Sequence, residues 1–256
     1  MQLQDIRAVV TGGVSGLGFA VASHLVAQGG KVALFDINDE KGAAAVAELG
    51  AGNAFYFRTD VSDEANVETN VAAAKAALGG LNAAINCAGI LGAGRVLGKE
   101  GPMPLSQFQT TVMVNLVGSF NVAKAAAQLM QANDANADGE RGVIVNTASV
   151  AAYEGQIGQA AYSASKGGVV GMTLPMAREF SRFGIRVMTI APGIFQSPMM
   201  AALPDDVQQA LGKMVPFPPR LGRPDEFASL VAEIVRNPML NGEVIRLDGA
   251  IRMAPK

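Results

Sequence analysis

The chain has little chemistry that depends on sulfur or imidazole. Its 256 residues include one cysteine, Cys87, and one histidine, His24. A single cysteine excludes an intramolecular disulfide framework and a cysteine-rich metal cluster, so we expect a reducing, cytoplasmic location. A single histidine excludes multi-histidine zinc sites and the usual histidine-centred triads unless His24 serves alone, and its helical pattern marks it as an ordinary helix residue. The sequence therefore predicts no metal site.

The chain also lacks the marks of a membrane or nucleic-acid-binding protein. No apolar run approaches the roughly 20 residues that span a bilayer, and the N-terminus has no basic region typical of a signal peptide. The net charge is −2 and the pI about 5.5, whereas nucleic-acid binding needs a basic face. Half of the residues are hydrophobic and 16% are charged, which allows a large core. We expect a small-molecule partner, with no membrane and no nucleic acid.

Short apolar runs alternate with helical patterns along the whole chain. The expected strands cover residues 6–10, 31–35, 54–57, 81–86, 142–148, 185–190 and 243–247. The expected helices cover residues 15–28, 39–49, 63–78, 105–132, 159–183, which contains Pro175, and 224–236. Because each crossover is a helix, we predict one α/β domain over residues 1–256, with a doubly wound parallel sheet flanked by helices on both faces. Ligands of such sheets bind beyond the carboxyl ends of the strands.

A glycine-rich turn follows the first expected strand. Residues 11–18 read TGGVSGLG between a strand and a helix. Glycines allow a sharp turn and a close approach of a pyrophosphate to the helix N-terminus, although an ordinary glycine-rich loop has the same composition. The candidate cofactor residues of this turn are Gly12, Ser15, Gly16, Leu17 and Gly18.

Two acidic residues end the next two expected strands. Asp36 stands 18 residues after the last glycine of the turn, where a carboxylate can bind an adenosine ribose and repel a 2′-phosphate. Neither Val14 nor Ile37 offers a cation for such a phosphate, so we predict NAD rather than NADP. Asp60 and Val61 are placed to meet the adenine, although a turn-forming role for Asp60 is about as probable from sequence alone.

Tyr162 and Lys166 lie four residues apart in an expected helix and therefore on one face of it. A lysine ammonium near a phenol favours the phenolate. To act as a base near neutrality, a tyrosine with an ordinary pKa of about 10 needs a shift of roughly three units, or about 4 kcal/mol, so a second cation is wanted as well. Ser149 precedes Tyr162 by thirteen residues at the end of another strand, whereas Tyr153 has Ile157 rather than a cation four residues on.

These motifs together resemble the short-chain dehydrogenase/reductase family. The matching pieces are residues 11–18, Asp60-Val61, residues 86–89 (NCAG), Asn115, Ser149, residues 162–166 (YSASK) and Pro192-Gly193, in the family's order over nearly the whole chain. The resemblance implies a single-domain Rossmann fold with a seven-stranded sheet and a nicotinamide cofactor. It also implies a dimer or tetramer joined by the two long helices at residues 105–132 and 159–183.

The resemblance gives each site residue an expected role. Tyr162 is the general base, and Lys166 lowers its pKa and binds the nicotinamide ribose. Ser149 holds the substrate oxygen, and Asn115 bends its helix and holds a water near Lys166. The oxidised nicotinamide is the second cation. The cofactor is expected to run along Cys87, Ala88, Gly89, Pro192, Gly193, Phe195 and Ser197, with no thiol chemistry at Cys87.

One branch of the family resembles the chain more closely, over residues 146–168, 184–193, 215–222 and 240–253. That branch oxidises the 3-hydroxyl of short or branched 3-hydroxyacyl-CoA esters with NAD, in fatty-acid or branched-chain amino-acid degradation, and also accepts hydroxysteroids. The resemblance implies this activity and a homotetramer. A dehydrogenase of hydroxysteroids or other secondary alcohols, and an NAD-binding scaffold subunit of a complex, remain open alternatives.

Two loops are expected to decide which substrate is used. Residues 91–104 form a long glycine- and proline-containing loop that departs from this branch, and its Arg95 and Lys99 are candidate cations for an acidic CoA ester, although most surface cations are merely solvated. Residues 194–219 carry five prolines around a short helical piece at 205–213. We expect residues 198–215 to fold over the substrate as a lid, with a loosely packed surface helix as the alternative.

Overall fold

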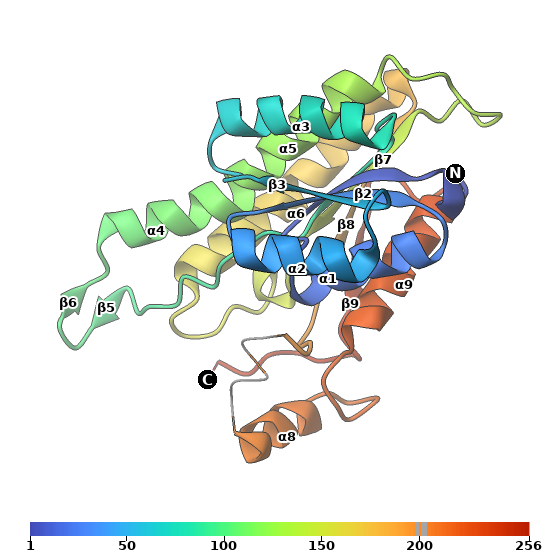
Figure 1. Ribbon diagram of the computed structural model, residues 1–256. Helices are drawn as coiled ribbons and strands as arrows, with labels where there is room; N and C mark the ends of the chain where they lie inside the picture. Colours follow the sequence, from blue (N-terminus) through green and yellow to red (C-terminus); the bar gives the residue numbers. More distant parts are fainter. Residues whose placement is uncertain (198–199, 201–203, 256) are drawn as a thin grey trace.

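Seven parallel strands form the central sheet of the protein (Figure 1). The computed structural model describes residues 1–197, 200 and 204–255. The strand order is β3-β2-β1-β4-β7-β8-β9, and every pairing in this sheet is parallel. The strands are β1 (Arg7–Thr11), β2 (Lys31–Asp36), β3 (Ala54–Arg58), β4 (Ala83–Asn86), β7 (Gly142–Thr147), β8 (Ile185–Pro192) and β9 (Val244–Leu247). The predicted doubly wound parallel sheet is confirmed.

Helices cover both faces of this sheet (Figure 1). The helices α1 (Gly16–Ala27), α2 (Asp39–Leu49) and α9 (Pro224–Arg236) pack on one face with the buried side chains of alternate strand positions. The helices α3 (Glu64–Leu78), α5 (Gly118–Met130) and α6 (Ala160–Phe180) pack on the other. The sheet is thus buried on both sides, as expected when every crossover is helical.

Local sequence explains several helix boundaries. The side chain of Asn38 accepts a hydrogen bond from Lys41 N at 2.9 Å at the start of α2, and that of Asp63 accepts one from Asn66 N at 3.1 Å at the start of α3. Side-chain oxygens at these positions satisfy amides that have no partner within the helix. The expected helix starts at residues 39 and 63 are met to within one residue.

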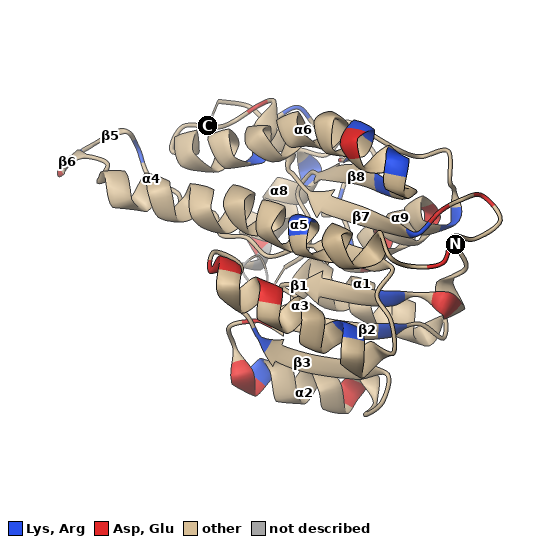
Figure 2. Cartoon of the chain, turned by 90° about the horizontal axis from the view of Figure 1, so that it is seen from above, with Lys and Arg blue, Asp and Glu red and all other residues tan. Residues whose placement is uncertain are grey.

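The predicted helix over residues 105–132 differs from the structure at its centre. It consists of α4 (Leu105–Val112) and α5, joined by a π-helical turn, η2 (Met113–Val117). In the 91–104 loop, β5 (Leu97–Gly98) and β6 (Gly101–Pro102) pair as a small antiparallel hairpin. Figures 1 and 2 both show this hairpin projecting from the body of the molecule next to α4.

The remaining elements are short or lie near the chain ends. They are η1 (Leu3–Asp5), η3 (Val150–Ala152), η4 (Ser181–Phe183) and α8 (Asp205–Lys213). Pro175 lies inside α6, which continues through it. Within the described part of the chain, no helix combines the length and the apolar character that a membrane crossing requires.

Candidate active site

The glycine-rich turn joins β1 to α1 at the carboxyl end of the sheet. Gly12 and Gly16 adopt φ values of 61° and 54°, which side chains other than glycine rarely adopt. α1 packs so tightly on the turn that a Cβ at Gly18 would collide with the carbonyl oxygen of Gly12. Ser15 precedes α1 as its N-cap, and its side chain makes no capping hydrogen bond, so its hydroxyl is available to a ligand. This turn presents the helix N-terminus and its free amides to an anion.

Thr11 ties this turn to the end of β4. Its hydroxyl oxygen accepts hydrogen bonds from both Cys87 N and Ala88 N, each at 3.0 Å. The backbone after β4 therefore lies directly beside Gly12. A Cβ added to Gly12 would be only 3.1 Å from backbone atoms of Cys87 and Ala88. Thr11 is not among the site residues predicted from sequence, although its place at the start of the glycine motif was a signal for it. Its hydroxyl holds together two segments that were predicted to follow the cofactor.

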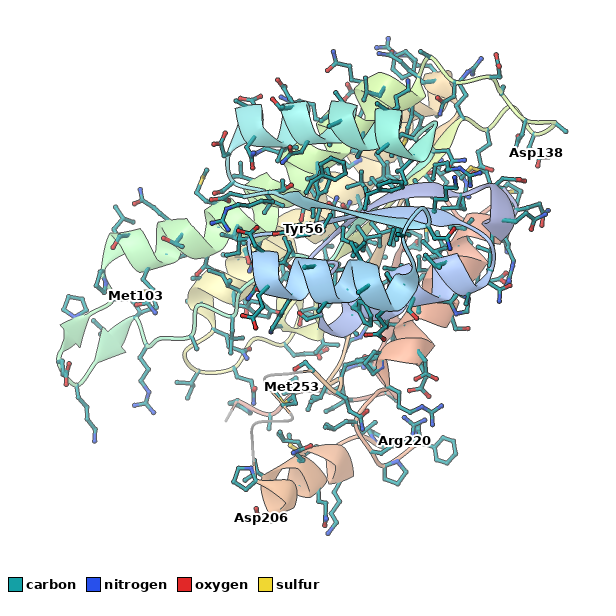
Figure 3. The ribbon with its side chains drawn as sticks, in the orientation of Figure 1. Tyr56, Met103, Asp138, Asp206, Arg220 and Met253 are labelled. Carbon is teal, nitrogen blue, oxygen red and sulfur yellow. The ribbon has the colours of Figure 1, made fainter. Side chains whose placement is uncertain are left out.

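Asp36 ends β2 next to this turn. Its Oδ1 accepts a hydrogen bond from Asn38 N at 3.1 Å, whereas among the described residues Oδ2 has no partner. The hydroxyl of Tyr56 on β3, labelled in Figure 3, lies 3.0 Å from the backbone oxygen of Asp36 and 2.9 Å from Asp39 Oδ1, and so links the end of β2 to the start of α2. A hollow of about 250 Å³ lies beside the turn, and Lys41 is a cation on its wall. Asp36 therefore keeps one carboxylate oxygen free for a ribose hydroxyl.

Asp60 acts first of all as a turn former. Its Oδ1 accepts hydrogen bonds from Ser62 N at 2.9 Å and from Ser62 Oγ at 2.7 Å. Val61 is buried against Gly118 of α5, where a larger residue would collide with it. The turn-forming interpretation of Asp60 thus describes its observed contacts, and an adenine contact for Asp60 and Val61 stays a prediction.

Ser149, Tyr162 and Lys166 come together from two elements. Ser149 follows β7 and caps η3, where its Oγ accepts a hydrogen bond from Ala151 N at 3.1 Å. Its side chain also hydrogen-bonds the Tyr162 hydroxyl. Lys166 lies one helical turn below Tyr162, with its Nζ 5.8 Å from the centroid of the phenol ring. The predicted set of serine, tyrosine and lysine is therefore assembled by the fold at the carboxyl end of the sheet.

Burial shifts the pKa values of Lys166 and Tyr162 in opposite directions. The Lys166 ammonium is almost fully buried and donates to the backbone oxygen of Thr147 at 2.7 Å. Burial lowers the pKa of Lys166 to about 8. Burial also raises the pKa of the Tyr162 phenol above its ordinary value, and only the hydrogen bond with Ser149 lowers it. Lys166 does not offset this desolvation, because its ammonium is directed at a backbone carbonyl. The prediction assigns the lowering of this pKa to Lys166 together with a second cation, the oxidised nicotinamide, and it stays a prediction.

Asn115 lies in the π-helical turn and is fully buried. Its Oδ1 accepts from Ile90 N at 2.8 Å, and its Nδ2 donates to Ile90 O at 2.9 Å and to Ser165 Oγ at 3.0 Å. The side chain thus joins the segment after β4 to α6, one residue from Lys166. The expected distortion of the helix at Asn115 is present, and the water that it was expected to hold stays a prediction.

Cys87 lies between the turn and Lys166. Burial raises the pKa of its thiol to about 11, and Thr147 Oγ1 donates to its sulfur at 3.6 Å. A thiol with so high a pKa carries almost no thiolate at neutral pH, and the thiolate is the reactive form. The expectation that Cys87 contributes backbone rather than sulfur chemistry agrees with this burial.

The residues after β8 are held closely by neighbouring elements. A Cβ at Gly193 would lie 2.9 Å from the Asp248 backbone, and the Phe195 ring packs edge-on against Phe227 at 6.4 Å between centroids. Ser197 Oγ accepts from Met200 N at 3.2 Å. Phe195 therefore directs its ring into the protein, so that a cofactor contact there would come from the backbone. Pro192 is the last residue of β8, and Gly193 follows it at the carboxyl end of the sheet. A cofactor contact at either residue stays a prediction.

The two predicted substrate loops differ in how far they can be described. Arg95 and Lys99 are exposed on the hairpin loop, and Arg95 borders a hollow of about 480 Å³ with Leu97 and Ile157. Leu97 and Ile157 are 80% and 54% exposed, so this hollow offers apolar surface to a ligand. The predicted lid at 198–215 includes residues 198–199 and 201–203, which lie outside the described residues; α8 forms the part expected as a helix.

The residues of the turn and the strand ends fit a dinucleotide cofactor. Positive φ angles at Gly12 and Gly16 shape a cradle that a side chain would fill, and Asp36 keeps a free carboxylate oxygen beyond it. At the other end, a Cβ on Gly89 would lie 3.1 Å from Asn115 Oδ1 and 3.5 Å from Lys166 Nζ. Gly89 therefore lies beside Lys166. These features suit a pyrophosphate at the turn and a ribose hydroxyl at Lys166.

Comparison with known proteins agrees with this geometry. The family model described as short chain dehydrogenase matches residues 7–208. The 3-hydroxyacyl-CoA dehydrogenase type-2 of Homo sapiens is 53% identical over 255 residues, which cover 99% of this chain and 97% of that protein. The protein of the same name from Drosophila melanogaster is 52% identical, with 99% and 100% covered. The crystal structure of 3-hydroxyacyl-CoA dehydrogenase type-2 from Mycobacterium avium matches with a TM-score of 0.90 and 42% identity, over 97% of this chain and 96% of that one.

Proposed function

Because the chain belongs to the short-chain dehydrogenase family and is an oxidoreductase that uses a nicotinamide cofactor, we propose that it oxidises the 3-hydroxyl of short or branched 3-hydroxyacyl-CoA esters. The reaction is reversible and yields the 3-ketoacyl-CoA ester. The observation that carries this proposal is the identity of about half of all residues, over the full length, with relatives named for that activity. The whole chain acts as one catalytic domain, with residues 194–219 as its substrate loop, and assembles as a homotetramer.

Each residue of the triad has a separate task in this reaction. Tyr162 accepts the proton of the substrate hydroxyl, and Ser149 binds the same oxygen and sets its angle. An oxidised nicotinamide held beside Tyr162 and Lys166 would supply the hydride acceptor for the 3-carbon and a positive charge near the phenol. That charge would add the stabilisation of the phenolate that Lys166 does not provide alone, because the pKa of Tyr162 lies above its ordinary value. Lys166 keeps further N–H donors for a ribose hydroxyl beside its bond to Thr147.

The substrate is tested with a panel of alcohols at saturating NAD. We expect the kcat/KM for 3-hydroxybutyryl-CoA and its 2-methyl-branched analogue to exceed that for a 17β-hydroxysteroid and for free 3-hydroxybutyrate by at least about tenfold, or roughly 1.4 kcal/mol. A higher value for the steroid would replace the proposed substrate with a hydroxysteroid. The free acid reports whether the CoA moiety contributes to binding.

The cofactor is proposed to be NAD because of Asp36. A 2′-phosphate placed near its carboxylate would meet like charge, which costs several kcal/mol, so we expect kcat/KM with NAD to exceed that with NADP by more than about 100-fold. Asp36→Asn removes the charge and is expected to narrow this ratio. Asp39→Asn is the matched control: Asp39 is an exposed carboxylate paired with Arg58, and asparagine keeps an oxygen for the hydrogen bond from Tyr56, so the ratio should stay unchanged. Comparable efficiency of the wild-type enzyme with both cofactors would contradict the prediction.

A further inference from the structure

One short segment connects the two halves of the triad. Residues 153–159, here the bridge segment, run from η3, which Ser149 caps, to α6, which carries Tyr162 and Lys166. At its first end Glu154 N donates to Val150 O at 2.9 Å, inside the turn that begins at Ser149. At its other end Ser163 N donates to Gln159 O at 2.7 Å. The conformation of the bridge segment therefore sets how Ser149 meets the Tyr162 hydroxyl.

Arg246, which lies on β9, holds the bridge segment through Glu154. Glu154 accepts hydrogen bonds from both terminal nitrogens of Arg246 on β9, Nη1 to Oε1 at 2.7 Å and Nη2 to Oε2 at 2.9 Å. This two-pronged pairing restrains direction as well as distance, which a lysine could not reproduce. Both side chains are only 23% exposed, so the pair is less weakened by solvent than a surface pair.

Arg246 is in turn held rigidly. Its Nε donates to Asp248 Oδ2 at 2.7 Å, and its Nη2 also donates to Ile251 O at 3.1 Å. The Asp248 side chain is largely buried. Its Oδ1 accepts a hydrogen bond at 2.9 Å from the backbone nitrogen of Ala250, which has a φ of 67°. The guanidinium thus joins the edge strand of the sheet to the bridge segment through a chain of charge-assisted hydrogen bonds.

Three further hydrogen bonds connect the bridge segment to its neighbours. Ile157 N donates to Pro255 O at 3.0 Å, in the C-terminal segment marked by Met253 in Figure 3, and Gln156 Nε2 donates to Ala254 O of that segment at 3.1 Å. Gly94 N donates to Gly158 O at 2.8 Å, which joins the hairpin loop to the bridge segment. These are single hydrogen bonds farther along the segment, whereas the two-pronged Glu154 pairing lies closer to Ser149 in the chain.

We propose that Arg246 is a positioning residue: through Glu154 it fixes the bridge segment and so aligns the Ser149 hydroxyl with Tyr162. This inference rests on the proposed roles of Ser149 and Tyr162 in the oxidation. In the part of the chain that the structure describes, Arg246 hydrogen-bonds Glu154, Asp248 and Ile251 and none of the predicted site residues. Its contribution is the alignment of groups whose displacement by about 1 Å can cost on the order of a hundredfold in rate.

The test is a double-mutant cycle with Arg246→Met and Ser149→Ala. Arg246→Met is expected to lower kcat by about tenfold or more while the KM for NAD changes less than about twofold, because alignment is lost and cofactor binding is kept. In the Ser149→Ala background the same substitution is expected to change kcat by less than about twofold, since the group that it aligns is gone. Arg246→Lys, which keeps the charge but loses the paired geometry, is expected to recover only part of the rate.

A control substitution at Arg252 and a more conservative substitution at Glu154 complete the experiment. Arg252→Met removes a cation from the same cluster, but Arg252 is 60% exposed and lies 3.5 Å from Glu154, so its kcat should stay within about twofold of wild type. If Arg246→Met does not fold, Glu154→Gln removes the pairing with little change of shape and takes its place in the cycle. Equal losses of kcat in both backgrounds, or wild-type kcat in Arg246→Met, would overturn the positioning role of Arg246 and leave the proposed function standing. Wild-type kcat in Ser149→Ala would contradict the proposed site itself.

Discussion

Tyr162→Phe is expected to reduce kcat for alcohol oxidation to less than about 1% of the wild-type value, since a positioned general base contributes about 10²–10⁴-fold. Phenylalanine keeps the ring and loses only the hydroxyl, which hydrogen-bonds Ser149. Ser149 retains its hydrogen bond from Ala151 N, so the turn at η3 stays capped. The loss is therefore expected in turnover and not in folding.

The control for this substitution is Tyr153→Phe. Tyr153 lies nearer to Ser149 along the chain, and 47% of its surface is exposed. The Arg246 guanidinium lies over its ring at 5.2 Å from the centroid, a contact that phenylalanine keeps, so we expect wild-type kcat. Circular dichroism and thermal unfolding check that both variants are folded. Turnover above about 1% in folded Tyr162→Phe would remove Tyr162 from the role of base.

Lys166→Met is expected to lower kcat/KM at least about a hundredfold, through the loss of the ribose contact and of the charge beside the phenol.

The second expected effect of Lys166→Met concerns the free energy of unfolding. Burial lowers the pKa of Lys166 from 10.5 to about 8, so between these pH values the unfolded chain binds more protons than the folded one. Stability arising from this group therefore rises with pH across that window, by up to about 3 kcal/mol.

The measurement is the free energy of unfolding of both proteins between pH 7 and pH 10.5. The wild type is expected to gain stability relative to Lys166→Met as the pH rises. The comparison between the two proteins removes the contributions of Tyr56 and Cys87, whose raised pKa values act in the opposite direction. A constant difference across the range would mean that Lys166 is not desolvated in the folded protein.

Residues close in sequence made much of the fold predictable. The strands are short branched runs, and oxygens of Asn38 and Asp63 mark helix starts. The break in the long central helix was predicted only through the family resemblance, which placed a bend at Asn115, because residues 112–118 form an ordinary helical pattern. Its cause is tertiary: the Asn115 side chain bonds both backbone groups of Ile90, which lies 25 positions earlier.

The residues that form the site were predictable from sequence, whereas their pKa values were not. Motif order placed Ser149, Tyr162 and Lys166 together, and the structure brings them together. The pKa of Tyr162 depends on burial and on the direction of the Lys166 ammonium toward Thr147, and spacing along a helix reports neither. The pairing of Glu154 with Arg246 spans 92 positions and no motif signals it.

The central claim is that hydride leaves the 3-carbon of an acyl-CoA alcohol for NAD while Tyr162 takes the proton. The most direct measurement is mass spectrometry of the products formed from NAD and 3-hydroxybutyryl-CoA carrying deuterium at that carbon. The account predicts 3-ketobutyryl-CoA without the label and NADH that carries one deuterium. Unlabelled NADH, or no ketone after prolonged incubation with the folded enzyme, would contradict it.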